Sequence, residues 1–206
     1  LPLLLIMVSI ENIFAAGAAV LAGRQLGAGD RDGAGRTVTT VVGISMFIGM
    51  GLCIGGILFM EPLLTAFGAS EAVLPQAKEY AFWMFVAALA NLPAQSMNCA
   101  ARAESSVRIS SVAVITGAVL NVVLDPVFMF DWGLGLGVGG ASLATTVSQF
   151  VTFLILAWFY LCGHSVIKIK RVYFRPDWKL VKEVTLIGIP TAVIQICLAV
   201  ATSLTN

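Results

Sequence analysis

Six long apolar stretches constrain the fold of this chain more than any other feature of its sequence. They cover residues 1–22, 38–60, 80–101, 109–130, 138–162 and 184–205. A helix of ~20 residues crosses the hydrocarbon core of a bilayer. Only 11% of the residues are charged, whereas a soluble domain carries about 25%. The sequence therefore predicts an all-α integral membrane protein with six transmembrane helices.

The basic residues between these stretches predict the orientation of the chain. Of the 12 lysines and arginines, all but Lys78 fall in three connections, which cover residues 23–36, 102–108 and 163–183. Cytoplasmic loops carry an excess of such residues, so these three connections are predicted to be cytoplasmic. Tryptophans gather at membrane interfaces. Two are expected at the outer interface and two at the inner one: Trp83 and Trp132, then Trp158 and Trp178.

The segment NVVLDPVFMF, residues 121–130, places a carboxylate inside a predicted span. A charge at mid-membrane costs ~2.5–3.5 kcal/mol, so an intramembrane aspartate indicates a functional site. Asn121 precedes Asp125 by four residues and shares its helix face. Pro126 has no N–H, which leaves the carbonyl of Val122 without its helical donor. These oxygens suit Na⁺, and a desolvated aspartate suits a proton, although Asp125 capping a kink would need neither.

Other polar residues in the spans indicate further candidates. Glu11 is either a second protonatable group or a packing partner for a neighbouring helix. Asn91, Gln95 and Asn98 recur at helical spacing beside Pro93, which is expected to kink the helix as Pro126 does. Such a polar stripe lines a water-filled cavity or forms hydrogen bonds between helices. Thr145 and Thr146 follow on the next helix, where either hydroxyl could reach Asp125.

Several motifs carry no enzymatic chemistry in their context. The sequence GAGD at residues 27–30 lies in a charged turn, not inside a span as in an intramembrane protease. His164 is the only histidine, and the four cysteines are scattered without a CxxC pair. We therefore expect no enzyme, no cofactor, no nucleic-acid partner and no metal beyond Na⁺ at Asn121 and Asp125.

Five phrases occur in a characteristic order: AAGAAVLAGRQLGAGD (15–30), PLLTAFGAS (62–70), ARAESS (101–106), LNVVLDPVF (120–128) and GVGGASLATTVSQ (137–149). Together they resemble the multidrug and toxic compound extrusion family. Members of that family have two six-helix halves and export organic cations in exchange for Na⁺ or H⁺. The resemblance implies a fragment that covers the second to seventh helices. Residues 1–162 would be the first bundle without its first helix, 163–183 a cytoplasmic linker, and 184–206 the first helix of the second half.

The resemblance also implies the residues of a coupling site. Asn121 and Asp125 match an asparagine and an aspartate on the fifth helix of relatives, and Ala141 and Thr145 match positions on the sixth. A glutamate that another branch carries on the seventh helix is replaced here by Leu198.

The resemblance implies a multi-pass antiporter of the inner (plasma) membrane that exports organic cations in exchange for H⁺ or Na⁺. It is expected to act as a monomer of the full-length chain, with a small-molecule substrate and the lipid bilayer as its partners. Two alternatives stay open. One is a lipid-linked oligosaccharide flippase of the same superfamily, which would need basic residues lining its cavity. The other is a non-transporting membrane scaffold.

Overall fold

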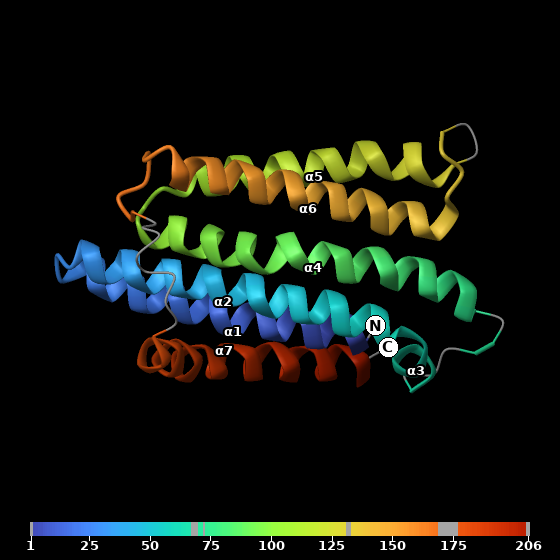
Figure 1. Ribbon diagram of the computed structural model, residues 1–206, viewed down its shortest axis with the longest axis horizontal. Coiled ribbons are helices and arrows are strands. Elements are labelled where there is room, and N and C mark those ends of the chain that lie inside the picture. The colour runs from blue at the N-terminus through green and yellow to red at the C-terminus, as the bar shows by residue number, and fades with distance from the viewer. Residues whose placement is uncertain (1, 67–69, 72, 131–132, 169–176, 205–206) are drawn as a thin grey trace. The chain divides into compact units, whose positions relative to one another are not determined.

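The computed structural model describes residues 2–66, 70–71, 73–130, 133–168 and 177–204. Within these ranges the chain forms helices joined by turns and short connections (Figure 1). The helices are α1 (Pro2–Gly27), α2 (Arg31–Leu58), α3 (Met60–Ala66), α4 (Leu74–Ala103), α5 (Val107–Met129), α6 (Gly137–Leu161) and α7 (Trp178–Leu204). Each of the six predicted spans lies on a long helix. The short α3 lies within a stretch that was predicted to be a loop.

Among the described residues, four helices are long and apolar enough to cross a membrane: Met7–Gly27 in α1, then α2, α5 and α6. Helix α4 is 30 residues long, but Asn91, Gln95 and Asn98 lower its mean hydropathy. Helix α7 is 27 residues long and covers the sixth predicted stretch. The assignment of α4 and α7 as spans therefore rests on their length and on the sequence pattern.

Helices extend further into the connections than the sequence pattern predicts. The glycine-rich connection 23–36 reduces to a turn at 28–30, because α1 continues to Gly27 and α2 begins at Arg31. Gly29 has φ 80°, and the amide of Asp30 donates to the Gln25 carbonyl, an arrangement that ends helices at a left-handed residue. The Asp30 carboxylate then accepts from the Gly33 amide at 2.8 Å and caps α2.

Three further predictions concern the start of the last helix, residues of the connections, and the two prolines within spans. Helix α7 begins at Trp178, before the predicted start at 184, so the end of the basic connection is helical. Lys170, Arg171, Arg175 and Trp132 lie outside the described residues. Helices α4 and α5 contain Pro93 and Pro126 and continue past them.

The chain divides into two compact units. Unit 1 comprises Leu1–Ser45, Gln95–Ser110 and Ala157–Asn206, and unit 2 comprises Met46–Ala94 and Ser111–Leu156. Unit 1 contains all three basic connections, and unit 2 contains the connections that follow α2 and α5. The side of the membrane on which the basic connections lie stays a prediction.

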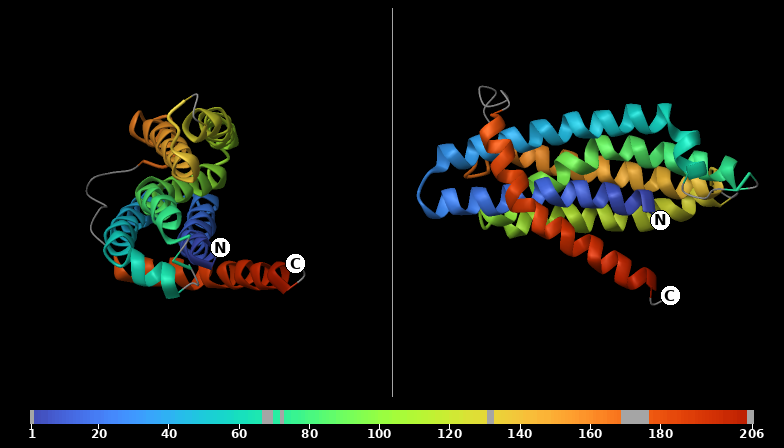
Figure 2. Two further views of the ribbon diagram at one scale, coloured as in Figure 1. Left: turned by 90° about the vertical axis from the view of Figure 1, so that its right-hand side faces the viewer. Right: turned by 90° about the horizontal axis from the view of Figure 1, so that it is seen from below.

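Within unit 1, α7 crosses α1 at very short range (Figure 2). A Cβ on Gly17 would overlap the Val184 carbonyl oxygen, and a Cβ on Gly188 would overlap the Ile13 carbonyl oxygen. Each helix thus supplies one glycine at which the other backbone comes closest. Small residues allow such close helix contacts in membranes, where dispersion drives helix association. The adjoining core consists of Ala18, Leu21, Val41 and Val184.

Gly17→Ala and Gly188→Ala should each destabilise the full-length protein by roughly 1–3 kcal/mol, because the added methyl group forces α1 and α7 apart. Gly51→Ala is the control, because that exposed helical glycine has no neighbour within 4 Å of an added Cβ. It should be neutral or stabilising by about 0.5–1 kcal/mol. Denaturation midpoints in detergent measure the difference. Equal stability of all three variants would contradict the close crossing.

In unit 2, an exposed ion pair joins α3 to α4. The Lys78 ammonium lies 2.7 Å from a Glu61 carboxylate oxygen. The hydrogen bond and the charge of Lys78 lower the pKa of Glu61 from its ordinary value. A lowered carboxyl pKa means that the pair stabilises the fold above the ordinary pKa of about 4.3 and loses this contribution as the pH falls through the lowered value.

Glu61→Gln should therefore lower the thermal midpoint at neutral pH and have no effect once wild-type Glu61 is protonated. Melting curves between about pH 7 and 3 measure this convergence. Glu71→Gln serves as the control, because the exposed Glu71 forms no ion pair within the described ranges. A difference between wild type and Glu61→Gln that persists at the acid end would contradict the pairing.

Candidate functional site

The four residues predicted for a coupling site lie together in unit 2. Asn121 and Asp125 are four residues apart on α5, and the Asn121 Nδ2 donates to Asp125 Oδ1 at 3.2 Å. The same Nδ2 donates to Thr145 Oγ1 of α6, also at 3.2 Å. Thr145 in turn donates to the Ala141 carbonyl at 3.0 Å. The sequence spacing thus identified residues that are adjacent in space, and cation binding by them stays a prediction.

The Asp125 carboxylate has no basic partner among the described residues. Its side chain is half-buried, and Asn121 and Ala141 are half-buried beside it. No lysine or arginine among the described residues forms an ion pair with Asp125. A carboxylate within a membrane span is costly unless a cation or proton neutralises it. The arrangement can therefore hold a small cation or a proton.

Glycines bring α5 and α6 into contact on both sides of this site. A Cβ on Gly117 would overlap the Thr152 hydroxyl, and a Cβ on Gly140 would overlap the Phe128 carbonyl oxygen. Gly135 and Gly137 adopt φ of 63° and 55° in the turn between the helices. This left-handed backbone favours glycine. The glycines of the α5–α6 hairpin therefore position Thr145 against Asn121.

The two threonines considered for the site point to different helices. Thr145 is exposed and contacts Asn121, whereas Thr146 is buried. The Thr146 hydroxyl lies 2.8 Å from the Trp83 carbonyl of α4 and 2.7 Å from the Ser142 carbonyl. Thr145 is thus the hydroxyl that reaches the Asp125 site, and Thr146 packs α6 against α4.

The additional candidates lie in other surroundings within their own units. Glu11 is buried in unit 1, with an exposed fraction of 8%, whereas Asp125 belongs to unit 2. Asn98 is buried, and its side-chain oxygen accepts a hydrogen bond from the Ser110 hydroxyl. This hydrogen bond joins α4 to α5, which is one of the two roles predicted for the polar stripe; a role of Asn98 in a cavity stays a prediction. Asn91 and Gln95 are half-buried.

The sequence pattern missed a second carboxylate with a clear structural role. In unit 1, Glu104 Oε2 accepts from the Ser165 hydroxyl at 2.6 Å and from the Ile167 amide at 3.0 Å. Ile167 is completely buried. A Cβ on Gly35 would lie 2.9 Å from the Lys168 carbonyl oxygen. Glu104 and α2 therefore hold residues 165–168 of the basic connection. The only sequence feature that pointed to this role was the position of Glu104 at a helix end, within ARAESS (101–106).

Comparison with known proteins gives the family. The MatE family model matches residues 1–127, more than half of the chain. The chain belongs to the MatE family. Its members are transporters and not enzymes, which agrees with the predicted resemblance and with the all-α membrane fold.

Individual relatives agree with this assignment. The multidrug export protein MepA of Staphylococcus aureus is 25% identical over 196 residues, which cover 95% of this chain and 43% of MepA. An inward-facing multidrug resistance MATE family transporter of the MOP superfamily superposes with a TM-score of 0.88, at 26% identity over 98% of this chain and 46% of that one. A MATE structure in complex with MaD3S gives a TM-score of 0.90 at 26% identity, over 98% of this chain and 45% of that one. The chain therefore spans less than half the length of these relatives.

Glu104→Ala should release residues 165–168 and speed tryptic cleavage after Lys168 by about tenfold, since it removes two hydrogen bonds to a charged acceptor. Glu104→Gln keeps one acceptor oxygen, so its cleavage rate should fall between those of wild type and Glu104→Ala. Limited proteolysis of the full-length protein, read by mass spectrometry, measures the rates, with Glu71→Ala as a surface control. An unchanged rate in Glu104→Ala would show that the connection is held by other contacts.

Proposed function

We propose that this chain is part of a secondary antiporter that exports organic cations and related toxic compounds in exchange for H⁺ or Na⁺. The names of its relatives, a multidrug export protein and a multidrug resistance transporter, support export. The observation that carries the coupling role is the Asp125 carboxylate. It lies in a membrane span, hydrogen-bonded to Asn121 and without a basic partner within the described residues. The protein would be a monomer in the inner (plasma) membrane.

The hydrogen-bond pattern suggests how a cation enters the site. The Asn121 amide nitrogen lies between the oxygens of Asp125 and Thr145, 3.2 Å from each. A bound Na⁺ would take this position between the oxygens. The amide would then turn to present its own oxygen to the ion, giving three side-chain oxygens of the kind that hard cations prefer. A proton would instead bind the Asp125 carboxylate directly, and the hydrogen bond from the Asn121 amide to Asp125 would then rearrange.

Binding of H⁺ or Na⁺ at the site would drive export by shifting the equilibrium between two conformations of the transporter. A ligand shifts an equilibrium only by its differential affinity for the two states. An ion that enters from outside and binds one conformation more tightly would favour release of the exported compound. Asp125 lies near the predicted outer end of α5, and Pro126 beside it removes one backbone hydrogen bond from that segment.

The flippase alternative gains no specific support from the described residues. Their lysines and arginines lie in connections or in the first or last two turns of a helix, and none lies mid-span where a pyrophosphate would need it.

Asp125→Asn should reduce ion-driven efflux of an organic cation to background, because the amide is isosteric but cannot take up a proton or balance Na⁺. Full-length protein in proteoliposomes, loaded with ethidium and driven by a pH or Na⁺ gradient, gives the rate. Glu71→Gln removes an exposed carboxylate elsewhere and should transport normally. Undiminished efflux by Asp125→Asn, at equal incorporation, would exclude the assignment.

A further inference from the structure

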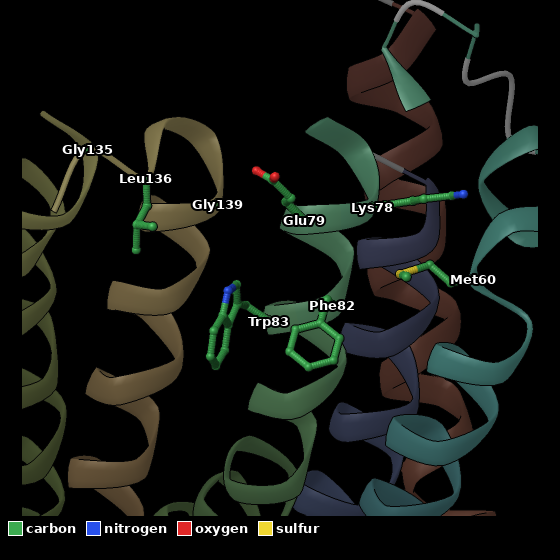
Figure 3. Close-up of a pocket in the computed structure, with 8 residues that line it drawn as sticks. All are labelled: Met60, Lys78, Glu79, Phe82, Trp83, Gly135, Leu136 and Gly139. Carbon is green, nitrogen blue, oxygen red and sulfur yellow. The ribbon is translucent and has the colours of Figure 1, made fainter. Parts of the chain in front are cut away.

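A groove in unit 2 lies apart from the residues of the Asp125 site (Figure 3). Its volume is about 600 Å³, within the range of small-molecule sites. Residues of α3, of the first turns of α4, and of the start of α6 with the turn before it surround the groove. They are Met60, Lys78, Glu79, Phe82, Trp83, Gly135, Leu136 and Gly139.

Glu79 and Trp83 form one side of this groove. They are four residues apart on α4, and both side chains project toward α6 in Figure 3. Gly139 leaves room for the carboxylate, since a Cβ there would lie 3.3 Å from Glu79 Oε2. The Trp83 carbonyl accepts the Thr146 hydroxyl at 2.8 Å, which fixes this turn of α4 against α6. Helix packing therefore fixes the backbone from which Glu79 and Trp83 project toward α6.

The charges of the groove favour a cationic ligand. Lys78 projects away from Glu79, toward Met60 (Figure 3), and its ammonium is paired with Glu61 at 2.7 Å. Glu79 is exposed and forms no ion pair in the part of the chain that the structure describes. Trp83 and Phe82 meet edge to face, with ring centroids 5.2 Å apart. An unpaired carboxylate beside aromatic rings attracts an organic cation by charge and by the cation–π interaction.

We propose that this groove binds an organic cation, whose charged nitrogen or phosphorus centre lies between the Glu79 carboxylate and the Trp83 indole. The apolar part of the ligand contacts Phe82 and Leu136. An anion is disfavoured, because Glu79 repels it and the nearest lysine is already paired. The inference goes beyond the proposed function, since binding here requires neither Asp125 nor a transport cycle.

Binding of tetraphenylphosphonium to the full-length protein in nanodiscs tests the proposal. Glu79→Gln and Trp83→Leu should each weaken binding about fivefold or more, since each removes one of the two interactions with the cation. Lys78→Gln is the matched control at the neighbouring position and should leave the affinity unchanged or tighter. Asp125→Asn should keep the part of tetraphenylphosphonium binding that depends on Glu79. The experiment therefore distinguishes a failure of the coupling assignment from a failure of this site. Tetraphenylborate, which has the same shape and the opposite charge, should show no dependence on Glu79.

The cation has two sources, an exported compound or the amine of a phosphatidylethanolamine headgroup, and the lipid of the nanodisc distinguishes them. If the affinity for tetraphenylphosphonium is equal in phosphatidylethanolamine and phosphatidylglycerol nanodiscs, the groove is assigned to a soluble organic cation. Weaker affinity in phosphatidylethanolamine assigns it to the headgroup amine. Equal affinity of wild type, Glu79→Gln and Trp83→Leu in both lipids would overturn the proposal, as would binding that weakens only in Lys78→Gln.

Discussion

The hydrocarbon core of a bilayer offers no hydrogen-bond partner, and the fold of this chain meets that constraint helix by helix. Backbone groups are paired within long helices, and hydroxyls inside the spans donate back to carbonyls of their own helix. Within the described residues six of them bond to the carbonyl four residues earlier: Thr39, Thr145, Thr146, Ser148, Thr152 and Thr185. Where hydroxyls are satisfied in this way, glycines let neighbouring backbones approach. Asp125 stands out against this background, because backbone hydrogen bonding within α5 does not neutralise a carboxylate.

The sequence alone predicted the long helices and the pairing of residues at the candidate site. Helix length follows from the bilayer thickness, so apolar stretches of about 20 residues are a strong signal. Asn121 and Asp125 share a face because of helical spacing, and a short glycine turn makes α6 the antiparallel neighbour of α5. These are local rules. They place Thr145 and Thr146 on the helix that neighbours Asn121, and the family resemblance pointed to Thr145.

Other features depend on contacts that sequence spacing does not encode. The Glu104 carboxylate reaches Ser165 and Ile167, about 60 residues further along the chain, so only the folded structure joins them. Gly17 meets Val184, and Gly188 meets Ile13, for the same reason. The polar stripe of α4 was ambiguous, because an asparagine in a span suits a cavity or a helix contact equally well. The structure adds a helix contact for Asn98, whose side-chain oxygen accepts a hydrogen bond from Ser110.

The central claim is that Asp125 exchanges a proton or a sodium ion within the membrane. Infrared difference spectroscopy of the full-length protein, with isotope-labelled aspartate, observes that carboxyl group directly. The account predicts a protonated-carboxyl band that disappears as the pH or the Na⁺ concentration rises and is absent from Asp125→Asn. An aspartate spectrum that is insensitive to both ions, or identical in wild type and Asp125→Asn, would contradict it.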